Sequence, residues 1–155
     1  PLLRVVLDSR LRLPTESRVA KTAQDNVLVL CSFAEEKKKK QLLKLGIRVE
    51  QLPVANSEGH PDMAAVLRFL GEMEMTSLMI EGGAMVNAAA LSADIVDKIF
   101  LYYAPRILGG TASVPFAGGA GFASINDAAY VKSTRLHHFA EDFAVEGYLK
   151  DPYAD

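Results

Sequence analysis

The sequence predicts an α/β protein with a mixed, mostly parallel sheet, helices on both faces and a C-terminal antiparallel hairpin. Two observations support this fold class. Short continuous apolar runs alternate with helical patterns through the early part of the chain, which is typical of parallel βαβ units. Two long β-type segments at the end, 130–139 and 143–149, are separated by only three residues, which favours an antiparallel hairpin.

The first half of the chain contains three expected strands, short apolar runs at 4–7, 26–31 and 47–52. Between the last two we expect a helix through Leu45, with Ser32 as its N-cap and Gly46 as its C-terminal stop. Its expected apolar side consists of Leu42, Leu43 and Leu45. A second helix is expected at 62–74, and residues 10–20 are expected to form a loop long enough to be functional.

The second half begins with the stretch 77–91, SLMIEGGAMVNAAAL, which we interpret as a strand at 78–80, a tight glycine turn and a helix. A longer strand is expected at 96–104, where Pro105 ends it. A loop rich in Gly and Ala follows at 106–126 and leads into the hairpin. No repeat, linker or composition shift divides the chain, so we expect a single domain over 1–155.

Composition excludes several classes of protein. The chain has 155 residues, of which 50% are hydrophobic and 23% charged, with a net charge of −2, so it favours a globular core and argues against nucleic-acid binding. The charged run at 35–40, EEKKKK, is expected to be the solvated start of a helix. Cys31 is the single cysteine, which excludes a disulfide framework and favours a reducing cytoplasm. No apolar run is long enough for a membrane span, so we expect a soluble protein.

The glycine turn is the first candidate ligand site. Gly82 and Gly83 would let a ligand approach the backbone, and the unpaired N–H groups at the start of the following helix favour an anion such as phosphate. Glu81 would lie at the carboxyl end of the preceding strand, where ligands bind in open α/β sheets. From these residues alone, a tight connection without a ligand is an equal alternative.

Other candidate groups are weaker. His137 and His138 are adjacent in an expected strand, so their side chains face opposite ways, and we expect surface roles rather than a metal site. His60 and Asp62 lie together in a loop without a third ligand nearby in the sequence. The glycines of 109–121 are expected to form a flexible surface loop.

Four segments together resemble a known family. RVVLDS at 4–9, LMIEGGAMVNAAAL at 78–91, VDKIFLYYAPRILGG at 96–110 and the closing strand pair are similar to the C-terminal reductase domain of the bifunctional riboflavin-biosynthesis deaminase/reductase. The resemblance implies a fold similar to dihydrofolate reductase. It also implies NADPH-dependent reduction of 5-amino-6-(5-phosphoribosylamino)uracil to the ribitylamino compound, by hydride transfer to the ribose C1′ carbon.

The resemblance also assigns residues. It implies that Glu81 contacts the phosphoribosylaminopyrimidine substrate and that Ser9 touches the cofactor. The other implied cofactor contacts are Gly82, Gly83, Ala84, Met85, Val86, Asn87, Ala88 and Ala89. No metal is needed, because the cofactor carries the hydride. Association of family members through their C-terminal strands implies a homodimer, and no residue of this chain is assigned as catalytic.

One departure bears on activity. Family members carry further strands and motifs before the segment that corresponds to 4–9, and these supply much of the substrate and cofactor site. We therefore expect little or no reductase activity from these 155 residues alone. Two alternatives remain open at this point: a dihydrofolate reductase-like enzyme acting on another pterin or pyrimidine, and a non-catalytic remnant that serves as an oligomerisation module.

Overall fold

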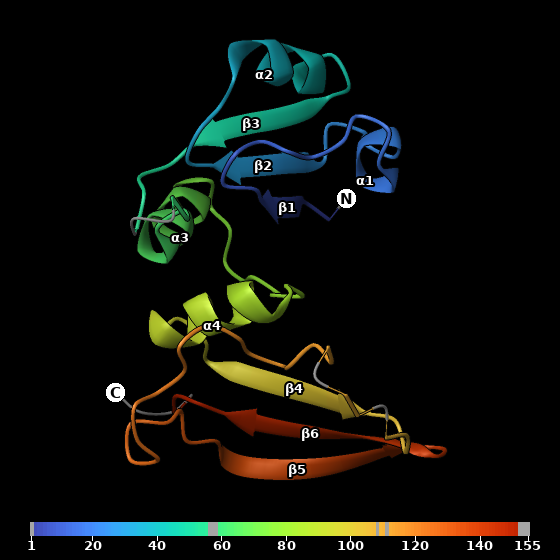
Figure 1. Cartoon of the computed structure of the whole chain (residues 1–155), viewed down its shortest axis with the longest axis vertical. Helices are drawn as coiled ribbons and strands as arrows, with labels where there is room; N and C mark the ends of the chain where they lie inside the picture. The colour runs from blue at the N-terminus through green and yellow to red at the C-terminus, as the bar shows by residue number, and fades with distance from the viewer. Residues whose placement is uncertain (1, 56–58, 108, 111, 152–155) are drawn as a thin grey trace. The chain divides into compact units, whose positions relative to one another are not determined.

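A computed structural model describes residues 2–55, 59–107, 109–110 and 112–151 (Figure 1). The chain divides into two compact units, Pro1–Leu78 and Met79–Asp155, which we call unit 1 and unit 2. Each unit is built around a three-stranded sheet. Residues 56–58, which precede His60 in the expected loop, lie outside the described residues. The expectation of a single domain over 1–155 stays a prediction.

Unit 1 contains a parallel sheet in the order β1 (Arg4–Leu7), β2 (Val27–Cys31), β3 (Ile47–Gln51). All five residues of β2 are fully buried, because this strand is paired on both edges and covered on both faces. An uninterrupted apolar run is what such a position requires. The three early strands expected from the sequence are therefore confirmed.

Helices cover both faces of this sheet. Unit 1 contains α1 (Arg18–Lys21), α2 (Glu36–Leu43) and α3 (Met63–Glu72). On one face Val27, Val29 and Cys31 pack with Leu42 of α2, and on the other Leu28 and Leu30 pack with Val66 and Leu70 of α3. The Asp62 side chain caps α3 by accepting a hydrogen bond from the Ala64 N–H.

Three details of unit 1 differ from the expectation. Ser32 is not the cap of α2: it is buried beside the sheet, and the N-cap position falls on Glu35, whose side chain makes no capping hydrogen bond. Leu43 and Leu45 are exposed, so Leu42 alone anchors α2 in the core. The expected loop at 10–20 ends in α1, which the Ser17 side chain caps.

Unit 2 contains α4 (Ala84–Ser92) and an antiparallel sheet of β4 (Lys98–Tyr103), β5 (Lys132–Phe139) and β6 (Asp142–Tyr148). The order is β4-β6-β5, so β6 is the central strand. The turn between β5 and β6 places Ala140 at a φ of 55°. The expected C-terminal hairpin is confirmed. The long strand expected at 96–104 is confirmed as β4, and the α/β fold class is confirmed as well.

The strand expected at 78–80 is wrong. Residues 77–83 have no regular secondary structure, and Met79 is 81% exposed. A strand needs a neighbour for its backbone hydrogen bonds, and among the described residues no strand pairs with this segment. The apolar run alone therefore did not determine the conformation, and Glu81 follows a segment without regular secondary structure rather than a strand.

No helix in the described ranges is both long and apolar enough to cross a membrane. The longest of them, α3, has ten residues, far fewer than the roughly 20 that a span requires.

Gly46, at the end of α2, provides a stability test. Its φ is +73°, and a Cβ at this position would lie 2.8 Å from the Asp25 Oδ1 atom. We expect Gly46→Ala to lower the free energy of unfolding by about 1–2 kcal/mol, because L-residues disfavour this backbone region. Chemical denaturation followed by circular dichroism measures the change.

The matched control is Gly71→Ala, which lies inside α3 with open space around the added Cβ. It should stabilise the protein by about 0.5–1 kcal/mol, because Ala favours a helix interior over Gly. If both substitutions changed the free energy of unfolding by the same amount, the backbone conformation at position 46 would not require glycine.

Candidate functional site

The carboxyl ends of the three parallel strands in unit 1 meet at one edge, and polar groups tie them together. The Ser9 carbonyl accepts hydrogen bonds from the N–H groups of Ser32 (3.0 Å) and Phe33 (2.9 Å). The Gln51 Nε2 atom donates to the Ser32 carbonyl at 2.8 Å. Ser9, Ser32 and Gln51 each end or follow a different strand, so this edge is a fixed polar platform.

A hollow of about 570 Å³ opens at this edge, lined by Arg10, Phe33, Ala34, Glu35 and Gln51. Ser32 is only 2% exposed, and its Oγ atom has no hydrogen-bond partner within the described structure. A buried hydroxyl without a partner is uncommon and calls for an explanation. This edge therefore offers a cation, an aromatic ring and a carboxylate to a polar ligand, with the Ser32 hydroxyl buried behind them.

The family resemblance named Ser9, which lies at this edge, whereas sequence reasoning did not name Arg10, Ser32 or Gln51 as site residues. The available signal was position, because each of these residues lies at or just past the carboxyl end of a parallel strand. Ser32 was instead interpreted as a helix cap, since a serine before a helical pattern commonly has that role.

In unit 2 the turn before α4 has the expected geometry at its glycines. Gly83 is the N-cap of α4 in an extended conformation, and its carbonyl accepts hydrogen bonds from Val86 and Asn87. A Cβ on Gly82 would lie 2.6 Å from the Val86 Cβ atom, so this position needs glycine. The N–H groups of Ala84 and Met85 make no hydrogen bond within the described structure, as expected for a first helical turn.

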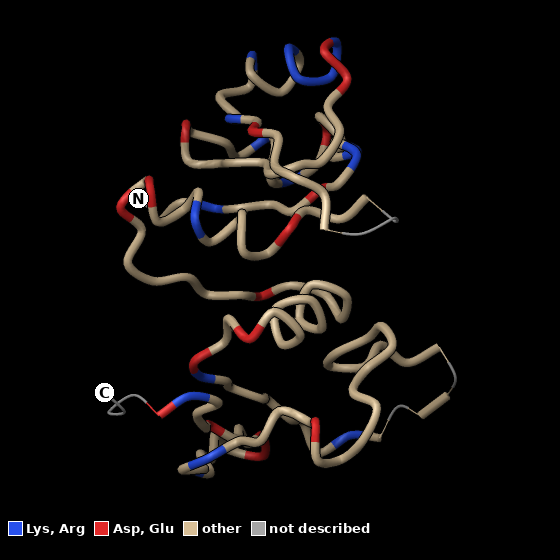
Figure 2. Tube along the Cα trace, turned by 90° about the vertical axis from the view of Figure 1, so that its left-hand side faces the viewer, with Lys and Arg blue, Asp and Glu red and all other residues tan. Residues whose placement is uncertain are grey.

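The other predicted residues of α4 have different surroundings. Met85 and Ala89 are exposed, whereas Ala84, Val86 and Ala88 are half-buried. The Asn87 Nδ2 atom donates a 2.8 Å hydrogen bond to the Phe116 carbonyl. Residues 82–93, which include α4, and residues 107–126 of the loop after β4 contain no charged side chain (Figure 2), while the acidic Glu81 precedes α4 in the sequence. Glu81 is exposed, so its carboxylate is accessible to a ligand.

Ser9 belongs to unit 1, and the other predicted site residues belong to unit 2. Within unit 1 the structure brings Ser9 together with Ser32 and Phe33. Within unit 2 it brings the start of α4 together with the loop around Phe116. In the described part of the chain no group of three His, Cys, Asp or Glu side chains is placed to hold a metal ion.

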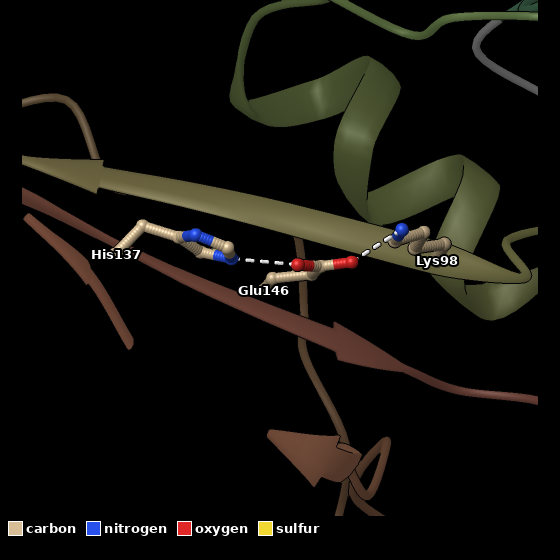
Figure 3. A network of polar contacts seen from close by, with 3 residues as sticks. All are labelled: Lys98, His137 and Glu146. Atoms are coloured by element: carbon tan, nitrogen blue, oxygen red, sulfur yellow. Dashed lines mark hydrogen bonds and ion pairs between the residues drawn. The ribbon is translucent and has the colours of Figure 1, made fainter. Parts of the chain in front are cut away.

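A second polar cluster lies on the antiparallel sheet, where each strand contributes one residue (Figure 3). The Glu146 Oε2 atom lies 2.6 Å from the His137 Nε2 atom, and Oε1 forms an ion pair with Lys98. Glu146 is 8% exposed. Its hydrogen bond with Lys98, followed by that with His137, lowers the pKa of Glu146 below its ordinary value of 4.5.

Aromatic rings surround this cluster. The Lys98 Nζ atom lies 5.0 Å from the ring centroid of Phe100 and 4.9 Å from that of Tyr148. The Phe100 and His137 ring centroids are 6.2 Å apart. The hydrogen bond with Glu146 raises the pKa of Lys98. The cluster is a satisfied polar network on the sheet, and none of its groups points to a bound ligand.

Comparison with known proteins gives a consistent result. The sequence profile of the family described as "RibD C-terminal domain" matches residues 1–145. The chain is 30% identical to the riboflavin biosynthesis protein RibD of Actinobacillus pleuropneumoniae, covering 97% of this chain and 40% of the relative. It is 29% identical to the 2,5-diamino-6-ribosylamino-4(3H)-pyrimidinone 5′-phosphate reductase of Archaeoglobus fulgidus, covering 92% of this chain and 61% of the relative.

Solved structures agree on the fold. RibD of Acinetobacter baumannii superposes with a TM-score of 0.75 at 22% identity, covering 94% of this chain and 37% of that one. The riboflavin biosynthesis reductase Rib7 of Saccharomyces cerevisiae gives a TM-score of 0.66 at 17% identity, covering 96% of this chain and 70% of that one. The expected reductase-domain fold, similar to dihydrofolate reductase, is confirmed. The chain spans about two fifths of the length of the RibD proteins it matches.

The lowered pKa of Glu146 predicts a specific pH dependence. A carboxylate whose folded-state pKa is lowered stabilises the fold above its unfolded pKa, and this contribution is lost as the pH falls through the folded value. We expect Glu146→Gln to reduce stability at pH 7 and to weaken the loss of stability below pH 4.5, the ordinary pKa of this carboxyl. Thermal melts between neutral and acidic pH measure both effects.

The control is Glu141→Gln, which removes an exposed carboxylate at the hairpin turn. Its pH profile should follow that of the unsubstituted protein. A Glu146→Gln profile parallel to that of the unsubstituted protein would show that the network does not hold a charged carboxylate.

Proposed function

The chain belongs to the RibD C-terminal domain family, and from this premise we propose that it binds NADPH and reduces 5-amino-6-(5-phosphoribosylamino)uracil to the ribitylamino product. The observation that carries the proposal is the family match over residues 1–145. When bound, the reduced nicotinamide would supply a hydride to the ribose C1′ carbon; the bond from C1′ to the ring oxygen breaks, and this oxygen takes a proton from solvent to give the alditol. The chain's own residues bind the two molecules and orient them.

In unit 2 the proposed cofactor contacts lie in the turn and the first two turns of α4, at Gly82 through Val86 and at Ala88 and Ala89. Two features support this assignment. The N–H groups of Ala84 and Met85 are unpaired within the described structure and favour an anionic group such as a phosphate. No atom lies within 4 Å of a Cβ built on Gly83, so a ligand has room to approach the backbone.

In unit 1 we propose that Ser9, Arg10 and Ser32 contact the cofactor at the carboxyl edge of the sheet. Arg10 would pair with a phosphate oxygen, since guanidinium groups bind phosphate with charge-assisted hydrogen bonds. The Ser32 hydroxyl, buried and unpartnered in the described structure, would gain the hydrogen bond that it lacks. The hollow beside it supports this assignment.

For the substrate, we propose that the Glu81 carboxylate accepts hydrogen bonds from N–H or O–H groups of the phosphoribosylaminopyrimidine. A carboxylate suits this role because an ionised carboxyl offers only acceptors. Glu81 is exposed, and no charged residue occurs in the twelve that follow it, so its charge is not neutralised by its sequence neighbours on the helix.

We further propose a cytoplasmic homodimer. The single cysteine is free and buried, and burial raises the pKa of the Cys31 thiol, so it suits a reducing compartment. The edge strand β5 and the aromatic side chains of Tyr102 and Phe139, which are 70% and 53% exposed, support association through unit 2.

Those same aromatic side chains favour a second candidate function, that of a non-catalytic oligomerisation module. Oligomers that bind no dinucleotide, detected by analytical ultracentrifugation and calorimetry together, would support this candidate over the reductase. A dihydrofolate reductase-like enzyme for another pterin or pyrimidine would bind NADPH but leave the ribosylaminopyrimidine unreduced.

Binding of NADPH tests the cofactor proposal directly. A ligand that binds only the folded protein raises the melting temperature by mass action. We expect NADPH to do so, and Arg10→Ala to weaken binding by about tenfold or more, the effect of losing a hydrogen bond to a charged group. Isothermal titration calorimetry measures the affinity.

Lys21→Ala is the control, because Lys21 is an exposed cation of α1 that pairs with Glu16. Lys21 also lies away from the proposed site. Its neighbour Thr22 accepts hydrogen bonds from Arg4 at the amino-terminal end of β1, whereas Arg10 follows the carboxyl end of this strand. Equal losses of affinity in the two variants would indicate a general charge effect and remove Arg10 from the site.

Glu81→Gln tests the substrate assignment. We expect kcat/KM for the ribosylaminopyrimidine to fall by about tenfold to a hundredfold, because the neutral amide is a weaker acceptor and the charge-assisted hydrogen bond is lost. NADPH affinity should stay unchanged. Turnover is measured by following the oxidation of NADPH spectrophotometrically, with the protein in the form in which its organism expresses it.

Glu72→Gln, an exposed carboxylate at the end of α3, serves as the control and should retain full turnover. Unchanged kcat/KM in the Glu81 variant would exclude this carboxylate from the substrate site.

A further inference from the structure

The loop after β4 is joined to the start of α4 by two hydrogen bonds. The Asn87 side-chain Nδ2 atom donates to the Phe116 carbonyl at 2.8 Å. The Gly118 N–H donates to the Ala84 carbonyl at 2.9 Å. Because Ala84 and Asn87 are three residues apart, they lie on the same side of the helix, and the segment 116–118 follows that side.

The contact depends on close approach rather than on buried apolar side chains. A Cβ on Gly118 would lie 3.3 Å from the Ala84 Cβ atom and 3.3 Å from the Met85 Sδ atom, tighter than an ordinary contact. The larger apolar side chains of this loop are exposed, 82% for Val114 and 51% for Phe116. The two hydrogen bonds therefore hold the segment against α4. Among the described residues, Asn87 is the only one that contributes a side-chain donor to this contact.

We propose that Asn87 is a positioning residue, which tethers the segment 116–118 to α4 and so holds it as a fixed wall beside the ligand site at the helix start. Its side-chain amide is committed to the Phe116 carbonyl and does not contact the cofactor. This replaces the role in cofactor contact that the family resemblance implies for Asn87. The ligand part of the proposal rests on the proposed function; the tether does not.

The chemistry of the wall follows from its composition. Residues 107–126 contain no charged side chain, and neither do residues 82–93 (Figure 2). The wall therefore contributes shape and backbone hydrogen-bonding groups but no charge. An anionic group at the helix start would be held by N–H groups of α4, while the tethered segment would limit how the rest of the ligand lies.

Asn87→Asp is the sharpest test, because the side chain keeps its shape and loses its donor. The carboxylate introduced cannot donate to the Phe116 carbonyl and would be repelled by it. A negative charge near the N-terminus of α4 does not weaken the helix, so loosening of the loop would not arise from fraying of α4. Ser124→Ala is the matched control, since it removes a hydrogen bond to Asp127 within the same loop but away from α4.

The readout is hydrogen exchange of residues 113–119 in the protein without ligand, together with NADPH affinity. We expect exchange of these amides to rise about fivefold or more in Asn87→Asp, and NADPH affinity to fall by a similar factor, while Ser124→Ala changes neither.

Two results would overturn the proposal. If Asn87→Asp lowers NADPH affinity while exchange in the ligand-free protein stays unchanged, the loss arises from direct contact or from repulsion between the new carboxylate and the anionic ligand, and Asn87 is not a tether. If exchange rises while affinity stays the same, the segment is not a wall of the site. Should the unsubstituted protein bind no NADPH, the proposed function fails, and the exchange measurement still decides whether Asn87 is a tether.

Discussion

Burial of β2 on both faces is the constraint on which unit 1 depends. Alternate residues of this strand point to opposite cores, Val27, Val29 and Cys31 to the core that contains α2, and Leu28 and Leu30 to the core that contains α3. Because neither face meets solvent, every residue of the strand must be apolar, and both helices must be present to cover it. The carboxyl end of this buried strand is where the chain first becomes polar, at Ser32. Its unpartnered hydroxyl in the described structure is thus a consequence of a strand buried up to its last residue.

Unit 2 depends on a different constraint. Its central strand β6 carries a carboxylate, Glu146, at a position with little access to water. Glu146 is held between Lys98 and His137 on the two neighbouring strands. A buried carboxylate without partners is costly, and in the order β4-β6-β5 Glu146 finds a partner on each neighbouring strand. The aromatic rings of Phe100 and Tyr148 then complete the shell around Lys98. His137 is therefore held by a hydrogen bond within the sheet.

The sequence predicted elements well where periodicity and burial agree, as in β2, in α3 and in the C-terminal hairpin. The prediction of a strand at 78–80 was wrong. An apolar run indicates that a segment can be buried, but it does not show whether a neighbouring strand is available to pair with it. Ser32 shows the same limit: the local pattern suggested a cap, while the position of β2 in the sheet decided the outcome. Arg10 and Gln51 could have been found by position, since they follow or end parallel strands. The tether through Asn87 could not, because it joins residues 29 apart in the sequence, and Phe116 lies in a segment without regular secondary structure.

The two glycines before α4 separate what the fold requires from what a ligand would require. At Gly82 a side chain would collide with Val86, 2.6 Å away, so packing within the chain explains the residue. At Gly83 the φ of −72° is ordinary for any amino acid, and no described atom lies within 4 Å of an added Cβ. Nothing in the described fold demands glycine there. The open space beside Gly83 adjoins the unpaired N–H groups of the first helical turn, so the anionic group of the proposed cofactor could approach the backbone at this point without meeting a side chain.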